Sequence, residues 1–238
     1  MTDAVTLQAK KIWLDKFQGA SLLLPVEFGS PLVQNAFKRT FYITARNSHF
    51  ISVFGRILLG EEKITEPEKH VRNAFNNAAE DFDRKLKAAQ AIVADAAITR
   101  FATYSATRKA EVQIITPISK RHLELLVKAD EFLLLVNTLW LHGEIDGSER
   151  ARRELEVKRK LRGVVAATRN MFLALRNELN RRKPEAAPVA NAGTANLGGE
   201  AAANDPGEAD IAAEEPPEPP QEPREPARAE RAAVNGSR

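Results

Sequence analysis

The sequence predicts a mainly α-helical protein, a bundle of long helices with one short β-strand, followed by a disordered C-terminal tail. Two observations predict the bundle. Apolar residues recur every three or four positions over most of residues 30–183, and only residues 109–116 alternate as a strand does. A third observation predicts the tail. Every aromatic residue lies between Trp13 and Phe172, so the residues that follow have no aromatic side chain to bury in a core.

Composition and charge both change near residue 183. Residues 184–238 hold nine of the 13 prolines, 11 acidic residues and four arginines, and such a segment buries too little apolar surface to order itself. The tail therefore has a formal charge of −7, which leaves +10 for residues 1–183 in a chain of net charge +3. We divide the chain into a partly ordered N-terminal segment (1–29), a helical body (30–183) and the acidic tail (184–238).

The first helix is predicted between Ser30 and Gly60. Serine is a favoured N-cap residue, Pro31 suits the first helical position, and glycine commonly ends a helix. The apolar residues assigned to its inner face are Val33, Phe37, Phe41, Phe54 and Leu58.

A second helix is predicted from Thr65, which with Glu68 matches a capping box. Its apolar residues follow one stripe that suits packing against a partner helix. They are Val71, Phe75, Ala78, Phe82, Leu86, Ala89 and Val93.

Residues 109–116 predict a single strand in which Val112 and Ile114 share one face. Lys109, Glu111, Gln113 and Ile115 share the other. Because a lone strand is unstable, it must pair with another part of the chain or with a second copy.

Two further helices follow. Pro117 and Ser119 predict the start of one that ends at Gly143, and Ser148 with Glu149 predicts the cap of the other. Inner positions are Leu123, Leu126, Val127, Leu133, Leu134 and Leu141 in the first, and Leu155, Leu161, Val165, Phe172, Leu175 and Leu179 in the second. The outer face of the last helix is rich in arginine and lysine, most densely in its first turns.

The sequence contains no pattern typical of an enzyme active site, so we expect neither catalysis nor a cofactor. It has no P-loop, dinucleotide fingerprint or nucleophile elbow. Cysteine is absent, the four histidines lack metal-ligand spacing, and Glu80, Asp81 and Asp83 are interpreted as a solvated helix face. No apolar segment is long enough to span a membrane and no signal peptide is recognised, which predicts a cytoplasmic protein.

The order strand, helix, glycine-containing turn, helix across residues 109–182 is that of a ribbon-helix-helix module. In that module two chains pair their strands into a ribbon that enters the DNA major groove, while a helix N-terminus holds a phosphate. Glu111, Gln113 and Ile115 would then face the bases. Lys109, Gly147, Ser148, Arg150, Arg152 and Arg153 would contact the backbone. The alternative is a local hairpin between the strand and the TYSAT segment, within an ordinary helical bundle.

Residues 109–182 closely, and the helical region from about residue 30 more loosely, resemble the AcaB-like family of transcriptional regulators of conjugative plasmids and integrative conjugative elements. The likeness covers the strand, a helix with the acidic pair Asp130 and Glu131 before a hydrophobic run, the glycine turn and the arginine-rich helix. It implies a dimeric, ribbon-helix-helix-related protein that binds promoter DNA of mobile-element genes. It identifies no base-contacting residue here, and Glu111 and Ile115 depart from a basic or amide-rich ribbon.

Together these features predict a DNA-binding regulator whose partners are double-stranded DNA, a second copy of the chain and, in some settings, a protein co-regulator. The alternative function is that of a helical interaction protein, an accessory component of a mobile element that does not bind DNA. Its motivation is the apolar stripe from Val71 to Val93.

Overall fold

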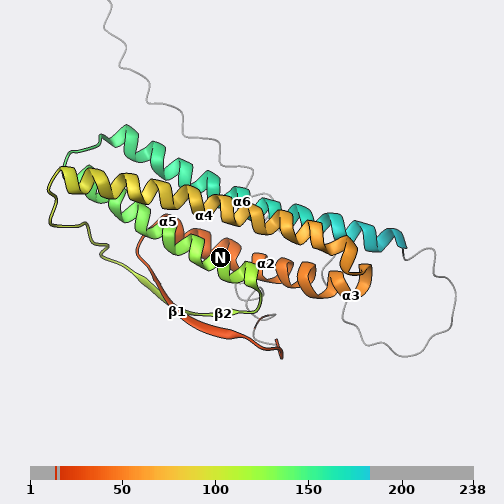
Figure 1. The fold of residues 1–238 in the computed structure, drawn as a ribbon. Helices are drawn as coiled ribbons and strands as arrows, with labels where there is room; N and C mark the ends of the chain where they lie inside the picture. The colour runs from red at the N-terminus through yellow and green to blue at the C-terminus, as the bar shows by residue number, and fades with distance from the viewer. Residues whose placement is uncertain (1–13, 15–16, 183–238) are drawn as a thin grey trace, which may run out of the picture. The chain divides into compact units, whose positions relative to one another are not determined.

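The computed structural model describes Leu14 and residues 17–182, so the predicted tail lies outside the described residues. The elements are β1 (Leu22–Phe28), α2 (Pro31–His49), the π-helical turn η1 (Phe50–Phe54), α3 (Gly55–Leu59), α4 (Glu61–Asp95), β2 (Arg108–Ile114), α5 (Pro117–Leu141) and α6 (Gly147–Arg182) (Figure 1). The predicted fold class is confirmed: long helices dominate, and the strand falls where the alternating pattern placed it.

The strand pairs with another part of the same chain, but not with the TYSAT segment. β2 pairs antiparallel with β1, an N-terminal strand of the same chain that the sequence did not predict, with Leu24 opposite Val112 and Pro25 opposite Glu111. The expected division of β2 is confirmed, since Val112 and Ile114 are buried. A long-range pairing of this kind leaves no local turn signal, whereas a hairpin would.

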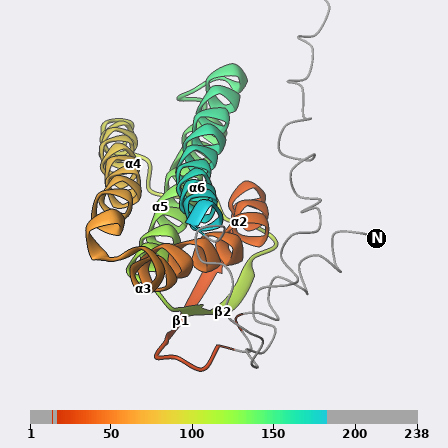
Figure 2. The same cartoon turned by 90° about the vertical axis from the view of Figure 1, so that its right-hand side faces the viewer.

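The elements form layers around α5. β1 packs on α2 and β2 on α5, while α6 packs on α2, α4 and α5. Figures 1 and 2 show the sheet on one side of the α2 and α5 pair and α6 on the other. The sheet and α6 therefore present separate surfaces to solvent.

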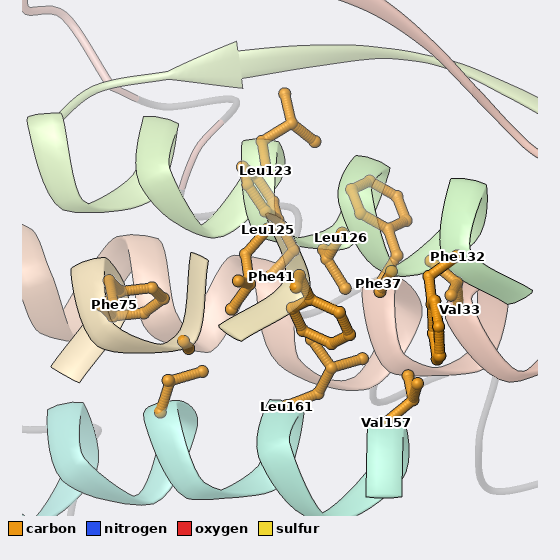
Figure 3. Packing of buried hydrophobic residues seen from close by; sticks show 14 of the residues in the cluster. Val33, Phe37, Phe41, Phe75, Leu123, Leu125, Leu126, Phe132, Val157 and Leu161 are labelled. Atoms are coloured by element: carbon orange, nitrogen blue, oxygen red, sulfur yellow. The ribbon is translucent and has the colours of Figure 1, made fainter. Parts of the chain in front are cut away.

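The core lies where these four long helices meet. Phe37 and Phe41 of α2, Phe75 of α4, Leu126 of α5 and Leu161 of α6 all point into it (Figure 3). Every residue of the predicted stripe from Val71 to Val93 is buried, so that stripe is used inside the chain and offers no surface to a partner.

The first predicted helix ends at Gly60 as expected, but the prediction of the residues on its inner face was partly wrong. Phe54 and Leu58 are 47% and 53% exposed, and Ile51 and Leu59 are buried instead. Phe54 comes thirteen residues after Phe41, and an α-helix makes about 3.6 turns over that length. The Phe54 side chain therefore points away from the face that Phe41 occupies.

The predicted capping box at Thr65 is also wrong. α4 begins at Glu61, directly after Gly60, whose φ of 88° favours glycine. The hydroxyl of Thr65 donates to the carbonyl of Glu61 inside the helix, at 2.9 Å. Glu68 does not return to the Thr65 amide; its buried carboxylate accepts from Arg56 at 2.7 Å and from Ser52 at 3.1 Å.

Two predicted inner residues lie at helix positions that face solvent. Leu141 is the last residue of α5 and is 65% exposed, and Leu155 of α6 is 43% exposed. The buried stripe of α6 instead follows Val157, Leu161 and Val164. Leu155 comes two residues before Val157, so its side chain points about 200° around the helix axis from that stripe.

One of the four histidines is a core residue, where an isolated surface or boundary position was expected. His122 is fully buried and stacks on Phe41 with ring centroids 5.9 Å apart. Burial lowers the pKa of His122 from 6.5 to about 3. Its Nε2 lies 3.4 Å from the Thr40 hydroxyl, so His122 belongs to the core as a neutral ring.

Asp130 of the acidic pair joins α5 to the start of α2. Its carboxylate accepts the backbone N–H groups of Gly29 at 2.9 Å and Ser30 at 2.8 Å. Burial raises the pKa of Asp130, and these two hydrogen bonds oppose that rise. Ser30 is the N-cap residue as predicted, but its own side chain makes no capping hydrogen bond.

Candidate nucleic-acid interface

The outer face of the sheet carries the predicted base-contacting residues, and it is close to neutral. Lys109 lies opposite Glu27 and its Nζ is 3.6 Å from the Glu27 carboxylate. Glu111, opposite Pro25, is exposed. With two glutamates beside one lysine, this face lacks the positive charge of a DNA-reading ribbon.

Gln113 and Ile115 are less available than the sequence suggested. The Gln113 amide donates to the Ser21 hydroxyl at 3.0 Å, and the residue opposite Gln113 is the apolar Leu23. Ile115 lies beyond the end of β2 and is half-buried. Base contact through Gln113 would require its bond to Ser21 to break.

The N-terminus of α6 already holds a carboxylate. Asp146 accepts the backbone N–H of Glu149 at 2.7 Å and the hydroxyl of Ser148 at 2.8 Å, and these bonds lower its pKa. Asp146 therefore caps the helix, the role that sequence reasoning assigned to Ser148. A phosphate at Gly147 and Ser148 would have to displace this resident anion.

The arginines of the first turns are paired with glutamates of the same helix. Arg152 donates to both oxygens of Glu149, at 2.7 and 2.8 Å, and Arg153 donates to it at 2.7 Å. Hydrogen bonds from Arg152 and then Arg153 lower the pKa of Glu149 to about 2. Ion pairs at the surface add little stability, so a phosphate can compete for these guanidinium groups.

Arg150 is held in a different way. Its guanidinium lies 4.4 Å from the centroid of the Trp140 ring and its side chain also pairs with Glu154 at 3.1 Å. Trp140 is in the last turn of α5, so this contact fixes the corner between α5 and α6. Arg150 is thereby oriented by packing as well as by charge.

The two halves of the predicted site are not brought together. Lys109, Glu111 and Gln113 lie on the sheet, while Gly147, Ser148 and the three arginines lie on α6, across the helical layer (Figures 1 and 2). One short segment of duplex touching one copy of the chain therefore contacts either the sheet or α6.

Asp81 and Asp83, two of the three acidic residues noted in the sequence of α4, form ion pairs. Asp83 lies 2.6 Å from the Lys128 ammonium, and Asp81 lies within 3.3 Å of both Lys85 and Lys160. Asp81, Lys85 and Lys160 line a depression between α4 and α6. Among the described residues there is no group of three acidic, histidine or cysteine side chains that could hold a metal ion, and no helix that could cross a membrane.

No protein-family model and no curated protein matches this sequence. Among solved structures, the crystal structure of selenomethionine-containing AcaB from uropathogenic E. coli is similar in fold, with a TM-score of 0.66 and 18% sequence identity. The match covers 70% of this chain and 86% of that one. This chain has an AcaB-like fold.

Proposed function

We propose that this chain is a DNA-binding transcriptional regulator of mobile-element genes that acts as a homodimer. The observation that carries the proposal is the AcaB-like fold, found over most of the chain, because it agrees with the resemblance of residues 109–182 to AcaB-like regulators. The formal charge of +10 on residues 1–183 supports a polyanionic partner.

The arginines at the start of α6 are the candidate phosphate contacts that the geometry favours over the sheet. Arg152 keeps 62% of its side chain exposed, and its partner Glu149 is bound through surface ion pairs that a phosphate can replace. The sheet contributes Lys109 and Gln113 as weaker candidates, because the face that carries them also carries Glu27 and Glu111 and is close to neutral.

Pairing between two copies has a place in this fold. β2 is hydrogen-bonded to β1 along one edge, and within the described part of the chain its other edge pairs with no strand. A second copy could extend the sheet at that edge. Sedimentation equilibrium of the full chain tests this, and a monomer at the concentrations where DNA binds would exclude the homodimer.

Salt titration of binding to duplex DNA tests the function. If four phosphates are contacted, the affinity should fall by roughly 150-fold between 50 and 200 mM salt, because log K falls with log salt at about −0.9 per contact. Fluorescence anisotropy of a labelled duplex measures this. Failure to bind any duplex at 50 mM salt would exclude DNA binding, and unchanged transcription from element promoters on deleting the gene would exclude regulation.

An exposed apolar patch supports the second candidate function, a helical interaction protein that does not bind DNA. Val53, Phe54, Ile57 and Leu58 follow one another through η1 and α3, and Ile57 is 74% exposed. Exposed apolar clusters commonly mark protein interfaces. A double variant, Ile57→Ser with Leu58→Ser, that loses self-association measured by light scattering while wild type fails to bind DNA would favour this function.

A further inference from the structure

The residues of η1 and α3 include an exposed apolar cluster at one end of the helical bundle. This cluster, which we call the η1–α3 apolar patch, consists of Val53, Phe54, Ile57 and Leu58. Each of its side chains is at least 40% exposed. α3 lies at the end of the bundle where α6 finishes (Figure 1), and there Lys63 of α4 is 3.5 Å from Glu178 of α6. Exposed apolar clusters commonly mark a surface that another segment or molecule contacts.

Contacts with α4 hold this patch toward solvent. The buried Glu68 carboxylate accepts hydrogen bonds from Ser52 at 3.1 Å and from Arg56 at 2.7 Å. Val53 and Ile57 directly follow these two residues, and each step along a helix rotates the side chain by about 100°, away from Glu68. The exposure of the patch is therefore a consequence of how η1 and α3 pack on α4.

The N-terminal end of the described chain leads to this patch. Leu14 is buried, and the backbone N–H of Phe17 donates to its carbonyl at 2.9 Å, so the two residues belong to one turn. The Phe17 ring packs edge-on against His49 with centroids 5.3 Å apart, and His49 packs against Phe54 of the patch at 5.4 Å. One imidazole ring therefore separates this turn from the patch.

Residues 1–13 precede the turn and lie outside the described residues, but their sequence suits an apolar surface. Ile12 and Trp13 stand directly before the buried Leu14, and tryptophan buries a large apolar area. Consecutive Cα atoms are about 3.8 Å apart, so these two residues must lie close to the turn that reaches His49. The segment therefore brings two large apolar side chains within reach of the patch.

Charge favours this segment over the C-terminal tail, which follows the end of α6. Glu61 and Glu62 are exposed in the first turn of α4, directly after α3. Residues 1–13 contain Lys10, Lys11 and one acidic residue, whereas residues 184–238 have a formal charge of −7 and no aromatic residue. The two glutamates repel the tail and attract the lysines, so the N-terminal segment is the better match in both charge and apolar content.

We propose that residues 1–13 of the same chain cover the η1–α3 apolar patch, with Ile12 and Trp13 as the main apolar contacts. The segment is then a built-in cover, and the patch becomes available to another protein only when the segment is displaced. This inference goes beyond the proposed function, because it does not depend on DNA binding. It competes with the second candidate function, which requires the same patch to be open.

A single introduced thiol tests the assignment, because the chain has no cysteine of its own. Leu58→Cys is made in the full chain, and the rate of its reaction with a thiol reagent is measured under native conditions. Adding Ile12→Ser with Trp13→Ser should raise this rate by roughly tenfold to 100-fold, since two apolar contacts that favour the covered state are lost.

The matched control is Phe101→Ser with Leu141→Ser in the same Leu58→Cys chain. It removes two exposed apolar side chains at the end of α5 and on the segment beside it. Because these positions are distant from the patch, the control should change the rate by less than about twofold.

Tryptophan fluorescence gives a second readout that does not depend on a thiol. Trp13 and Trp140 are the two tryptophans of the chain, so Trp140→Phe leaves Trp13 as the reporter. The covered indole should emit at shorter wavelength than indole in water. Ile57→Ser with Leu58→Ser should shift this emission to longer wavelength and increase its quenching by iodide, and an unchanged spectrum would contradict the contact.

The remaining outcomes distinguish the occupants of the patch. Equal reaction rates of Leu58→Cys with and without the Ile12 and Trp13 substitutions would show that the segment does not cover it. Protection that increases with protein concentration would assign the patch to a second copy. Protection that is lost when the chain ends at residue 183, but not in the segment variant, would assign it to the tail.

Discussion

Replacing His122 by leucine should remove most of the acid sensitivity that this residue gives to the fold. His122 is fully buried between Phe41 and Phe75, and its pKa is lowered from 6.5 to about 3. The imidazole is therefore neutral in the folded protein at pH 5, whereas in the unfolded chain it is protonated. Since the unfolded state binds more protons, stability falls as the pH is lowered below 6.5.

The magnitude follows from these two pKa values. Each pH unit below 6.5 costs about 1.4 kcal/mol until the folded pKa is reached, so lowering the pH from 7 to 5 removes about 2 kcal/mol. At pH 7 the substitution itself should cost little, because the ring makes one long contact to Thr40 and its Nδ1 has no hydrogen-bond partner.

Urea denaturation of wild type and His122→Leu at pH 7 and pH 5 measures the effect. The free energy of unfolding of wild type should fall by about 2 kcal/mol more than that of the variant, and other titrating groups cancel in this comparison. His70→Gln, at an exposed position, is the matched control and should behave as wild type. Equal losses in His122→Leu and wild type would show that a buried neutral His122 is the wrong description.

Three further perturbations have defined outcomes. Asp130→Ala leaves the N–H groups of Gly29 and Ser30 without their acceptor and should lower the free energy of unfolding by about 1–3 kcal/mol. Asp130→Asn keeps one acceptor oxygen and should lower it less. Equal losses in the two variants would argue against the capping role of Asp130. Glu68→Ala removes the shared partner of Ser52 and Arg56 and should cost about 1–3 kcal/mol by the same assay, with Glu66→Ala as an exposed control near zero. Ending the chain at residue 183 removes a charge of −7 and should tighten non-specific DNA binding in low salt; unchanged or weaker binding would contradict competition by the acidic segment.

Local patterns predicted the elements well where a single helix face decided them. The stripe from Val71 to Val93 was identified residue by residue, because a straight α-helix repeats its buried face every 3.6 residues. The same reasoning failed between Phe41 and Phe54, where the residues chosen were out of phase and a π-helical turn follows α2. Periodicity is reliable only within one unbroken helix.

The candidate site was harder to predict, because it depends on which elements are neighbours. Clustering in the sequence drew attention to Arg150, Arg152 and Arg153, yet Glu149 and Glu154 lie within reach of them on the same helix. The sheet that carries Lys109 and Gln113 and the helix that carries these arginines lie on separate sides of the helical layer, and no local signal indicates this.

The sequence by itself determined the long helices, the alternating strand, the change of charge near residue 183 and the excess of basic residues in the last helix. These depend on composition and on short-range spacing, which act along the chain. Tertiary structure alone decided that β2 pairs with β1, that His122 is enclosed by aromatic rings, and that α2 packs on α6. Each of these joins residues far apart in the chain, and packing of the whole core selects such contacts.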